Sequence, residues 1–165
     1  MIVIDAATAG DLPAVQALAR RIWRSHYPGI ITSEQIEYML ERGYDTATLS
    51  RFLETPGAGL AVARERAAPI GFAAWYRLEV AATSKLDKLY VASEHRREGI
   101  GRRLIEHVER AARGDGSGTL VLNVAKRNQA SIAVYVHCGF SVREEVVVDI
   151  GNGFVMDDYV MAKAL

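Results

Sequence analysis

Apolar residues recur at helical spacing in several parts of the chain. The clearest stripe is formed by Leu12, Val15, Leu18, Ala19 and Ile22, which lie three and four residues apart. Pro28 and Gly29 are expected to end this helix. Further helices are predicted after Thr32 or Ser33 as N-cap, over Tyr44 to Leu53, from Ile100 to about Arg113, and over Asn128 to His137.

The other apolar runs are rich in β-branched residues and predict strands. They are Ile2–Ile4, Gly59–Arg64, Ile70–Glu79, Lys85–Ala92, Thr119–Val124, Ser141–Ile150 and Phe154–Lys163. Consecutive strands with no helix between them indicate an antiparallel meander, whereas a strand, helix and strand indicate a parallel pair with a right-handed crossover. We therefore expect a single domain over residues 1–165 of mixed α/β (α+β) class. Its core would be a twisted, mostly antiparallel sheet of about seven strands, with a parallel βαβ unit at its middle and helices on both faces.

The turn before the helix at Ile100 has an unusual composition. In residues 86–101, LDKLYVASEHRREGIG, an apolar run leads into a charged turn and then into Gly99 and Gly101. The first N–H groups of a helix lack internal partners and carry partial positive charge, so anions bind there, and glycines allow close approach to the main chain. Four arginines and a single acid surround this turn: Arg96, Arg97, Arg102, Arg103 and Glu98. The pattern predicts a phosphate-binding turn; a helix cap beside a solvated basic face is the alternative.

Two common phosphate-binding motifs do not fit this turn. A P-loop ends in Gly-Lys-Ser/Thr, and no lysine follows Gly101. The dinucleotide fingerprint needs a third glycine where this chain has Leu104, and it follows a first strand rather than one in mid-chain.

A second pattern lies in the helix predicted over residues 128–137. Asn128, Ser131 and Tyr135 are spaced by three and four, so they share one helix face and can address one ligand. Asn128 is also well suited to be the N-cap of that helix. Gly139 and Phe140 are expected to be structural, as a C-cap and a core residue.

Together these segments resemble the GCN5-related N-acetyltransferases (GNAT), over nearly the full chain. The turn matches the family's Arg-x-x-Gly-x-Gly motif at Arg96, Gly99 and Gly101, and the helix matches Asn-x-x-Ala/Ser-x-x-x-Tyr-x-x-x-Gly-Phe. The resemblance implies that the turn holds the pyrophosphate of acetyl-coenzyme A, with no metal. It places these residues at the cofactor: Leu89, Tyr90, Val91, Arg96, Arg97, Glu98, Gly99, Ile100, Gly101, Arg102, Asn128, Ser131 and Tyr135.

The same resemblance assigns catalytic roles. Tyr135 is implied to be the general acid, because a phenol with a pKa of about 10 stays protonated and can donate to a leaving sulfur. A backbone N–H of the strand that holds Leu89, Tyr90 and Val91 is implied to bind the oxyanion. The base stays open among Glu79, Asp87, His26 and Glu34, each of which can equally be a surface charge.

The early helices are implied to form the acceptor pocket. Candidate substrate contacts are Trp23, His26, Tyr27, Glu79 and Asp87, together with Tyr38 and Tyr44. Aromatic residues at helical spacing are also typical of a core, and this alternative stays open.

The amino-acid composition limits the classes of binding partner that the protein can have. The charges of the 20 basic and 20 acidic residues cancel, which argues against a general nucleic-acid or membrane-surface binder. A nucleic-acid site on the four arginines is kept as a further hypothesis. The single cysteine, Cys138, and the lack of a signal-like first segment favour a cytoplasmic protein. We expect an N-acetyltransferase for a primary amine, on a small molecule or a peptide, acting as a monomer or homodimer. The alternative is a non-catalytic acyl-CoA-binding sensor or interaction module.

Overall fold

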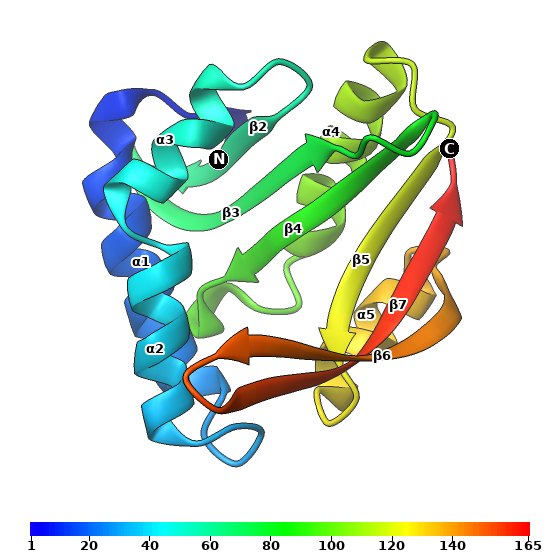
Figure 1. Ribbon diagram of the computed structural model, residues 1–165. Helices are drawn as coiled ribbons and strands as arrows, with labels where there is room; N and C mark the ends of the chain where they lie inside the picture. Colours follow the sequence, from blue (N-terminus) through cyan, green and yellow to red (C-terminus); the bar gives the residue numbers. More distant parts are fainter.

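Seven strands form one sheet, in the order β1-β2-β3-β4-β5-β7-β6 (Figure 1). The computed structural model describes residues 1–165. Its strands are β1 Ile2–Ala6, β2 Gly59–Glu65, β3 Ala68–Arg77, β4 Thr83–Val91, β5 Thr119–Ala125, β6 Ser141–Gly151 and β7 Phe154–Ala164. Its α-helices are α1 Leu12–His26, α2 Ser33–Gly43, α3 Thr46–Glu54, α4 Ile100–Gly114 and α5 Gln129–His137. The predicted mixed α/β architecture is confirmed.

Only one pair of neighbouring strands is parallel. β4 and β5 run in the same direction, and α4 connects them across one face of the sheet, while every other neighbouring pair is antiparallel. The parallel ladder is short, because it joins only Thr83–Lys85 to Thr119–Val121. At that point the buried hydroxyls of Ser84 and Ser117 are hydrogen-bonded at 2.7 Å.

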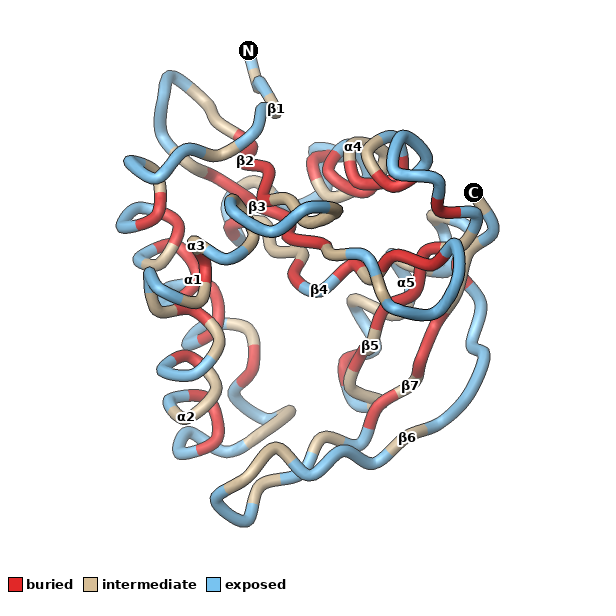
Figure 2. The backbone as a smooth tube through the Cα atoms, turned by 45° about the horizontal axis from the view of Figure 1, so that its top comes forward, coloured by how far each residue is buried: buried red, intermediate tan, exposed pale blue.

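The sheet separates two hydrophobic clusters. Along β2, Leu60 and Val62 face the cluster under α1, α2 and α3, whereas Ala61 and Ala63 face the cluster under α4. This alternation follows from the strand period of two. Buried positions run along β2, β3, β5 and β7, while β6 is exposed along most of its length (Figure 2).

Two local predictions were wrong. The helix predicted from Tyr44 begins at Thr46, because Asp45 has extended backbone and precedes the first turn. The strand predicted from Ile70 begins at Ala68, because the turn before it is made by Arg66 and Ala67, with φ of 48° and 71°. Neither turn residue is the glycine or asparagine that usually signals left-handed backbone.

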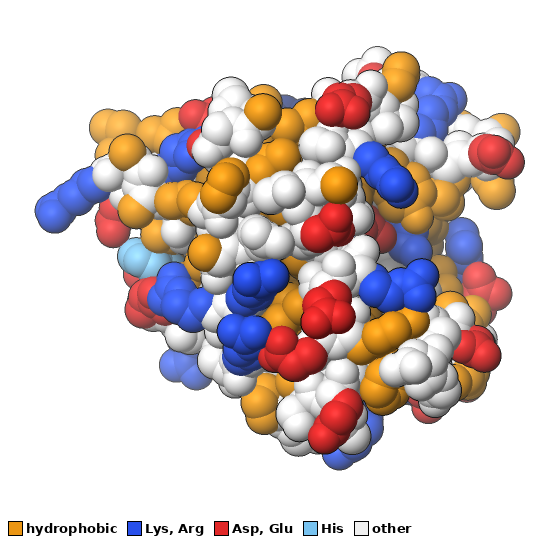
Figure 3. All heavy atoms as spheres, turned by 60° about the vertical axis from the view of Figure 1, so that its left-hand side comes forward, with side chains coloured by type: hydrophobic (Ala, Val, Ile, Leu, Met, Phe, Trp, Pro, Cys, Tyr) orange, Lys and Arg blue, Asp and Glu red, His pale blue; other side chains and the backbone are white.

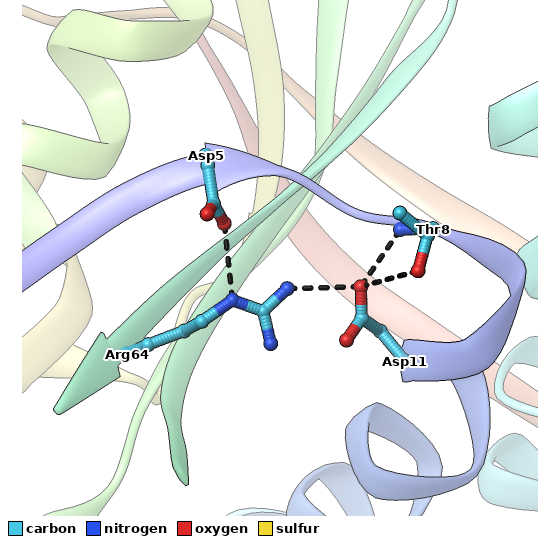
Figure 4. A network of polar contacts seen from close by, with 4 residues as sticks. All are labelled: Asp5, Thr8, Asp11 and Arg64. Carbon is cyan, nitrogen blue, oxygen red and sulfur yellow. Dashed lines mark hydrogen bonds and ion pairs between the residues drawn. The ribbon is translucent and has the colours of Figure 1, made fainter. Parts of the chain in front are cut away.

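An ion-pair network fixes the N-terminal segment to the sheet (Figure 4). Arg64 on β2 donates from Nε to Asp5 at 3.1 Å, and its Nη2 lies 2.9 Å from Asp11. Asp11 also accepts the backbone N–H and the hydroxyl of Thr8, at 2.8 and 3.0 Å. These contacts, the Arg64 hydrogen bond first, lower the pKa of Asp11 to about 2. The network joins β1 and the start of α1 to β2.

On the helical face that Figure 3 shows, basic side chains lie beside acidic ones. Arg24 on α1 donates two hydrogen bonds to the carboxylate of Glu37 on α2, in a bidentate pair at 2.8 and 2.9 Å. No helix of the structure is long and apolar enough to cross a membrane.

Candidate active site

The sheet opens between β4 and β5. Beyond Lys85 the two strands diverge, and the rest of β4 up to Val91 is paired with β3 alone (Figure 1). The register of β4 against β3 passes from Leu86 to Lys88 at neighbouring partners, so Asp87 is an extra residue that forms a β-bulge. The second half of β4 therefore presents an edge without a ladder partner to the opening.

Two cavities meet at this opening. We call the first the groove: its volume is about 820 Å³ and it is lined by the end of β4, the turn before α4, and one side of α5. We call the second the pocket: its volume is about 710 Å³ and it is lined by α1, α2, β4, β5, α5, the end of β6 and β7. Both cavities are lined by Leu89, Tyr90, Ser131 and Tyr135. These four residues form the junction between them.

The turn before α4 has the geometry of an anion site. Gly99 has φ of 74°, a left-handed conformation that glycine adopts without strain, and a Cβ built on it would meet no atom within 4 Å. No side chain caps the first turn of α4, so its N–H groups are free to bind a ligand in the groove. Ile100 is buried and anchors the start of the helix. The backbone, rather than one side chain, provides the donors.

The charged residues of the turn divide into two groups. Arg96, Arg97 and Arg102 line the groove. Arg103 instead donates to the carbonyl of Ile2 at 3.0 Å, and the carboxylate of Glu98 lies 3.4 Å from His95. Neither of these two residues lines the groove, although His95, the neighbour of Glu98, does.

His26 joins the turn to the start of α5. Arg96 donates to its Nδ1 at 3.2 Å, so its Nε2–H donates to the amide oxygen of Asn128 at 3.1 Å. Burial lowers the pKa of His26, the Arg96 guanidinium acts in the same direction, and the Asn128 contact opposes them. The neutral imidazole lies in the groove, and it does not line the pocket in which sequence analysis expected the substrate contacts.

Asn128 has a structural position. It is buried, and its amide oxygen also accepts the backbone N–H of Ser131 at 3.3 Å, as an N-cap does. It lines the pocket but not the groove. Ser131 and Tyr135 follow on the same helix and reach both cavities.

Helix α5 has no buried residue although its composition is apolar. Ala130, Ala133 and Val134 line the groove. This side of the helix is suited to an apolar ligand chain. Sequence analysis named only the polar residues of the helix and missed this apolar surface.

Tyr135 is partly buried at the junction. Its ring lies edge-on to Phe140, with 5.9 Å between centroids. Burial raises the pKa of Tyr135, and the neighbouring Tyr27 and Cys138 act in the same direction. The phenol therefore keeps its proton at neutral pH and can donate a hydrogen bond into either cavity.

Aromatic residues form one wall of the pocket. Trp23 and Tyr27 pack at 4.2 Å between centroids, and the hydroxyls of Tyr27 and Tyr90 lie 3.1 Å apart. Trp23, Tyr27 and Tyr44 belong to the core cluster and also line the pocket, so the core and the substrate interpretations are not exclusive. Tyr38 lines the pocket as well, and it donates to the carbonyl of Ile150 at 2.8 Å.

The acids proposed as bases lie in different places. Asp87 lines the pocket, where it pairs with Lys88 at 3.0 Å. Glu79 does not reach either cavity, because β3 ends at Arg77 and Glu79 lies exposed in the following loop. Glu34 is exposed at the start of α2 and also lies outside both cavities.

Several lining residues were missed by sequence analysis. They are Lys88, Asn123, Asp149 and Asp158 in the pocket and His95, His137 and Cys138 in the groove. Lys88 is buried, with its ammonium 4.4 Å from the centroid of the Tyr44 ring. A signal existed for Asp158, because Asp157 and Asp158 are adjacent in an apolar strand run, and the alternation places one of two neighbouring residues inward. In this structure no group of three or more His, Cys, Asp or Glu residues is arranged to hold a metal ion.

Known proteins share the family and the fold of this chain. The model of the acetyltransferase (GNAT) family matches residues 16–140, which include the turn and all of α5. The structure of PaiA N-acetyltransferase from Thermoplasma acidophilum, in complex with coenzyme A, superposes with a TM-score of 0.86 at 24% identity, covering 100% of this chain and 99% of that chain. A GCN5-related N-acetyltransferase from Rhodopseudomonas palustris gives a TM-score of 0.81 at 22% identity, covering 99% and 95%.

A ribosomal-protein-alanine N-acetyltransferase from Brucella melitensis gives a TM-score of 0.70 at 26% identity, covering 99% of both chains. No curated protein sequence matches the chain.

Proposed function

Because this chain belongs to the GNAT acetyltransferase family, we propose that it transfers the acetyl group of acetyl-coenzyme A directly to a primary amine. The observation that carries this proposal is the position of Tyr135, at the junction of two cavities that share only three other lining residues. A donor molecule in one cavity and an acceptor in the other can meet there. Such an arrangement favours a ternary complex.

The groove fits the cofactor. The free N–H groups at the start of α4, with Arg96, Arg97 and Arg102, would hold its diphosphate. The apolar side of α5 would contact the pantetheine chain. Acetyl-coenzyme A would supply the reactive thioester. The coenzyme A complex of the PaiA protein, which shares this fold, supports the same choice of ligand.

Two groups of this chain would stabilise the transition state. A backbone N–H of the segment Leu89–Val91, on the edge of β4 that has no ladder partner, would donate to the oxyanion. The phenol of Tyr135 would donate its proton to the departing sulfur. The raised pKa of Tyr135 keeps this proton in place until a thiolate develops beside it.

Cys138 is not needed for this chemistry. It lines the groove, and burial raises the pKa of its thiol, so it is a poor nucleophile at neutral pH. Direct transfer therefore predicts that Cys138→Ser keeps turnover.

The proposal is tested by two measurements on the same protein. Calorimetry with acetyl-coenzyme A measures binding, and a free-thiol assay measures coenzyme A release with n-butylamine, spermidine and alanine methyl ester. Binding with amine-dependent release supports the transferase. Binding without release for any amine would leave the non-catalytic module in its place, and no binding at all would overturn both.

A further inference from the structure

A buried carboxylate lies in the wall of the pocket without a hydrogen bond on one oxygen. Asp158 on β7 is 6% exposed and lines the pocket, and its Oδ1 has no hydrogen-bond partner. Leaving a buried polar oxygen unpaired costs free energy, and such groups concentrate at functional sites. None of the roles described above uses this residue.

The strand pairing explains why Asp158 faces inward. It lies opposite Ala125 of β5, another residue that lines the pocket. Successive strand residues point to opposite faces, so the preceding Asp157 points away. Asp157 is exposed and pairs with Lys126 at 2.8 Å. Two adjacent aspartates therefore have different environments.

The charges around Asp158 leave it without an ion-pair partner. Lys88, the buried cation of the pocket, is paired with Asp87, and Lys126 is paired with Asp157. Lys85 on β4 acts on Asp158 only at longer range. A cationic ligand group would supply what the protein does not.

The protein environment also suits a proton acceptor. Burial raises the pKa of Asp158, while the Asn123 amide and the cations Lys85 and Lys126 oppose the shift and Asp157 adds to it. Asp158 also contributes to the raised pKa of Tyr27, the residue that follows α1, although burial is the main cause. This places the carboxylate near the aromatic wall, and such rings favour an ammonium group.

We propose that Asp158 binds the protonated amine of the acceptor and then takes one proton from it, an inference that rests on the transferase function proposed above. The neutral amine nitrogen then forms the C–N bond with the thioester carbonyl carbon, and the C–S bond breaks. The nitrogen loses a second proton as the amide forms. One proton ends on the coenzyme A thiol by way of Tyr135, and the other passes from Asp158 to solvent. The acceptor class is an alkylammonium.

The first test compares Asp158→Asn with Asp157→Asn, which removes the same charge from the other face of the same strand. We expect Asp158→Asn to lower kcat/KM for the amine roughly 100-fold or more, and Asp157→Asn to stay within about threefold. The fall of kcat/KM at acid pH should disappear in Asp158→Asn. Calorimetry should show unchanged acetyl-coenzyme A binding in both variants. Amine kinetics of Asp158→Asn within about threefold of the unsubstituted protein would overturn the inference.

The second test needs neither turnover nor a variant that folds. In the coenzyme A-saturated protein, the carboxyl carbon of Asp158 is followed by NMR while n-butylammonium chloride is added. We expect a saturable shift of that resonance and a lower apparent pKa of Asp158 when the cation is bound. Saturable shifts in other pocket residues with none at Asp158, or no saturable shift anywhere, would overturn the inference. Failure of the transferase function appears separately, as an absence of thiol release in the unsubstituted protein.

Discussion

Replacing Gly99 by alanine should separate cofactor binding from folding. The residue has φ of 74°, and its Cβ would meet no protein atom within 4 Å, so the new methyl group would enter the groove without a clash. Left-handed backbone costs a residue with a Cβ about 1–2 kcal/mol. For a domain of this size each kcal/mol lowers Tm by about 2–4 °C. The methyl group would also displace a phosphate from the helix N–H groups, and losing one charge-assisted hydrogen bond of about 1.5–3 kcal/mol weakens affinity roughly 10- to 100-fold.

Gly153 offers a matched control. It has φ of 76°, it also has no atom within 4 Å of a built Cβ, and it lines neither cavity. Gly153→Ala should therefore lower Tm about as much as Gly99→Ala while leaving acetyl-coenzyme A affinity unchanged. Thermal unfolding and calorimetry measure the two quantities. Equal affinity in both variants would falsify the assignment of this turn as the diphosphate site.

Further outcomes test the proposed role of Tyr135, the packing of the sheet and the pairing of Asp11. Tyr135→Phe should lower kcat on the order of 100-fold with unchanged acetyl-coenzyme A affinity, as the thiol assay and calorimetry would show, because only the proton donor is lost. Gly59→Ala should lower the free energy of unfolding by about 1–3 kcal/mol, measured by urea unfolding, because its Cβ would overlap the buried ring of Trp75. Asp11 has a depressed pKa of about 2, so its pairing with Arg64 stabilises the fold above about pH 4 and is lost as the pH falls towards 2. Asp11→Asn should therefore cost roughly 1 kcal/mol at pH 7, after allowance for solvent screening, and much less at pH 2, measured by urea unfolding at both pH values.

The sequence predicted the elements and their order because most of them bury one face. The stripe of α1 and the alternation along β2 are direct records of the two core clusters. The turn at Gly99 was also predictable, since its requirements are local: a strand end, two glycines and a helix start.

The bulge in β4 explains why Lys88 was not predicted to line the pocket. Period-two alternation places Leu86 and Lys88 on one face, but the extra residue Asp87 turns them to opposite faces. Leu86 then enters the cluster under α4, while Lys88 lies against Tyr44 on the other side. Lys88 is buried in the pocket wall because of a backbone irregularity that no residue pattern predicts.

The pocket was less predictable because it is assembled from distant segments. Asp158 and Tyr27 are brought together only by the pairing of β7 with β5 and the packing of α1. Glu79 shows the opposite case: its strand stops at Arg77, and two residues of loop suffice to remove it from both cavities. Local patterns fix neither the ends of strands nor their neighbours across the sheet.

The short ladder between β4 and β5 joins two parts of the sheet that diverge beyond it. Three residue pairs and the Ser84–Ser117 hydrogen bond set the angle at which β4 and β5 diverge. None of these residues lines either cavity. A small repacking there would change the separation of Tyr90 from Tyr135 while every ligand contact kept its chemical identity. Substitutions in this ladder should therefore change the distance between the proposed acetyl donor and the amine acceptor, just as substitutions among the cavity-lining residues should.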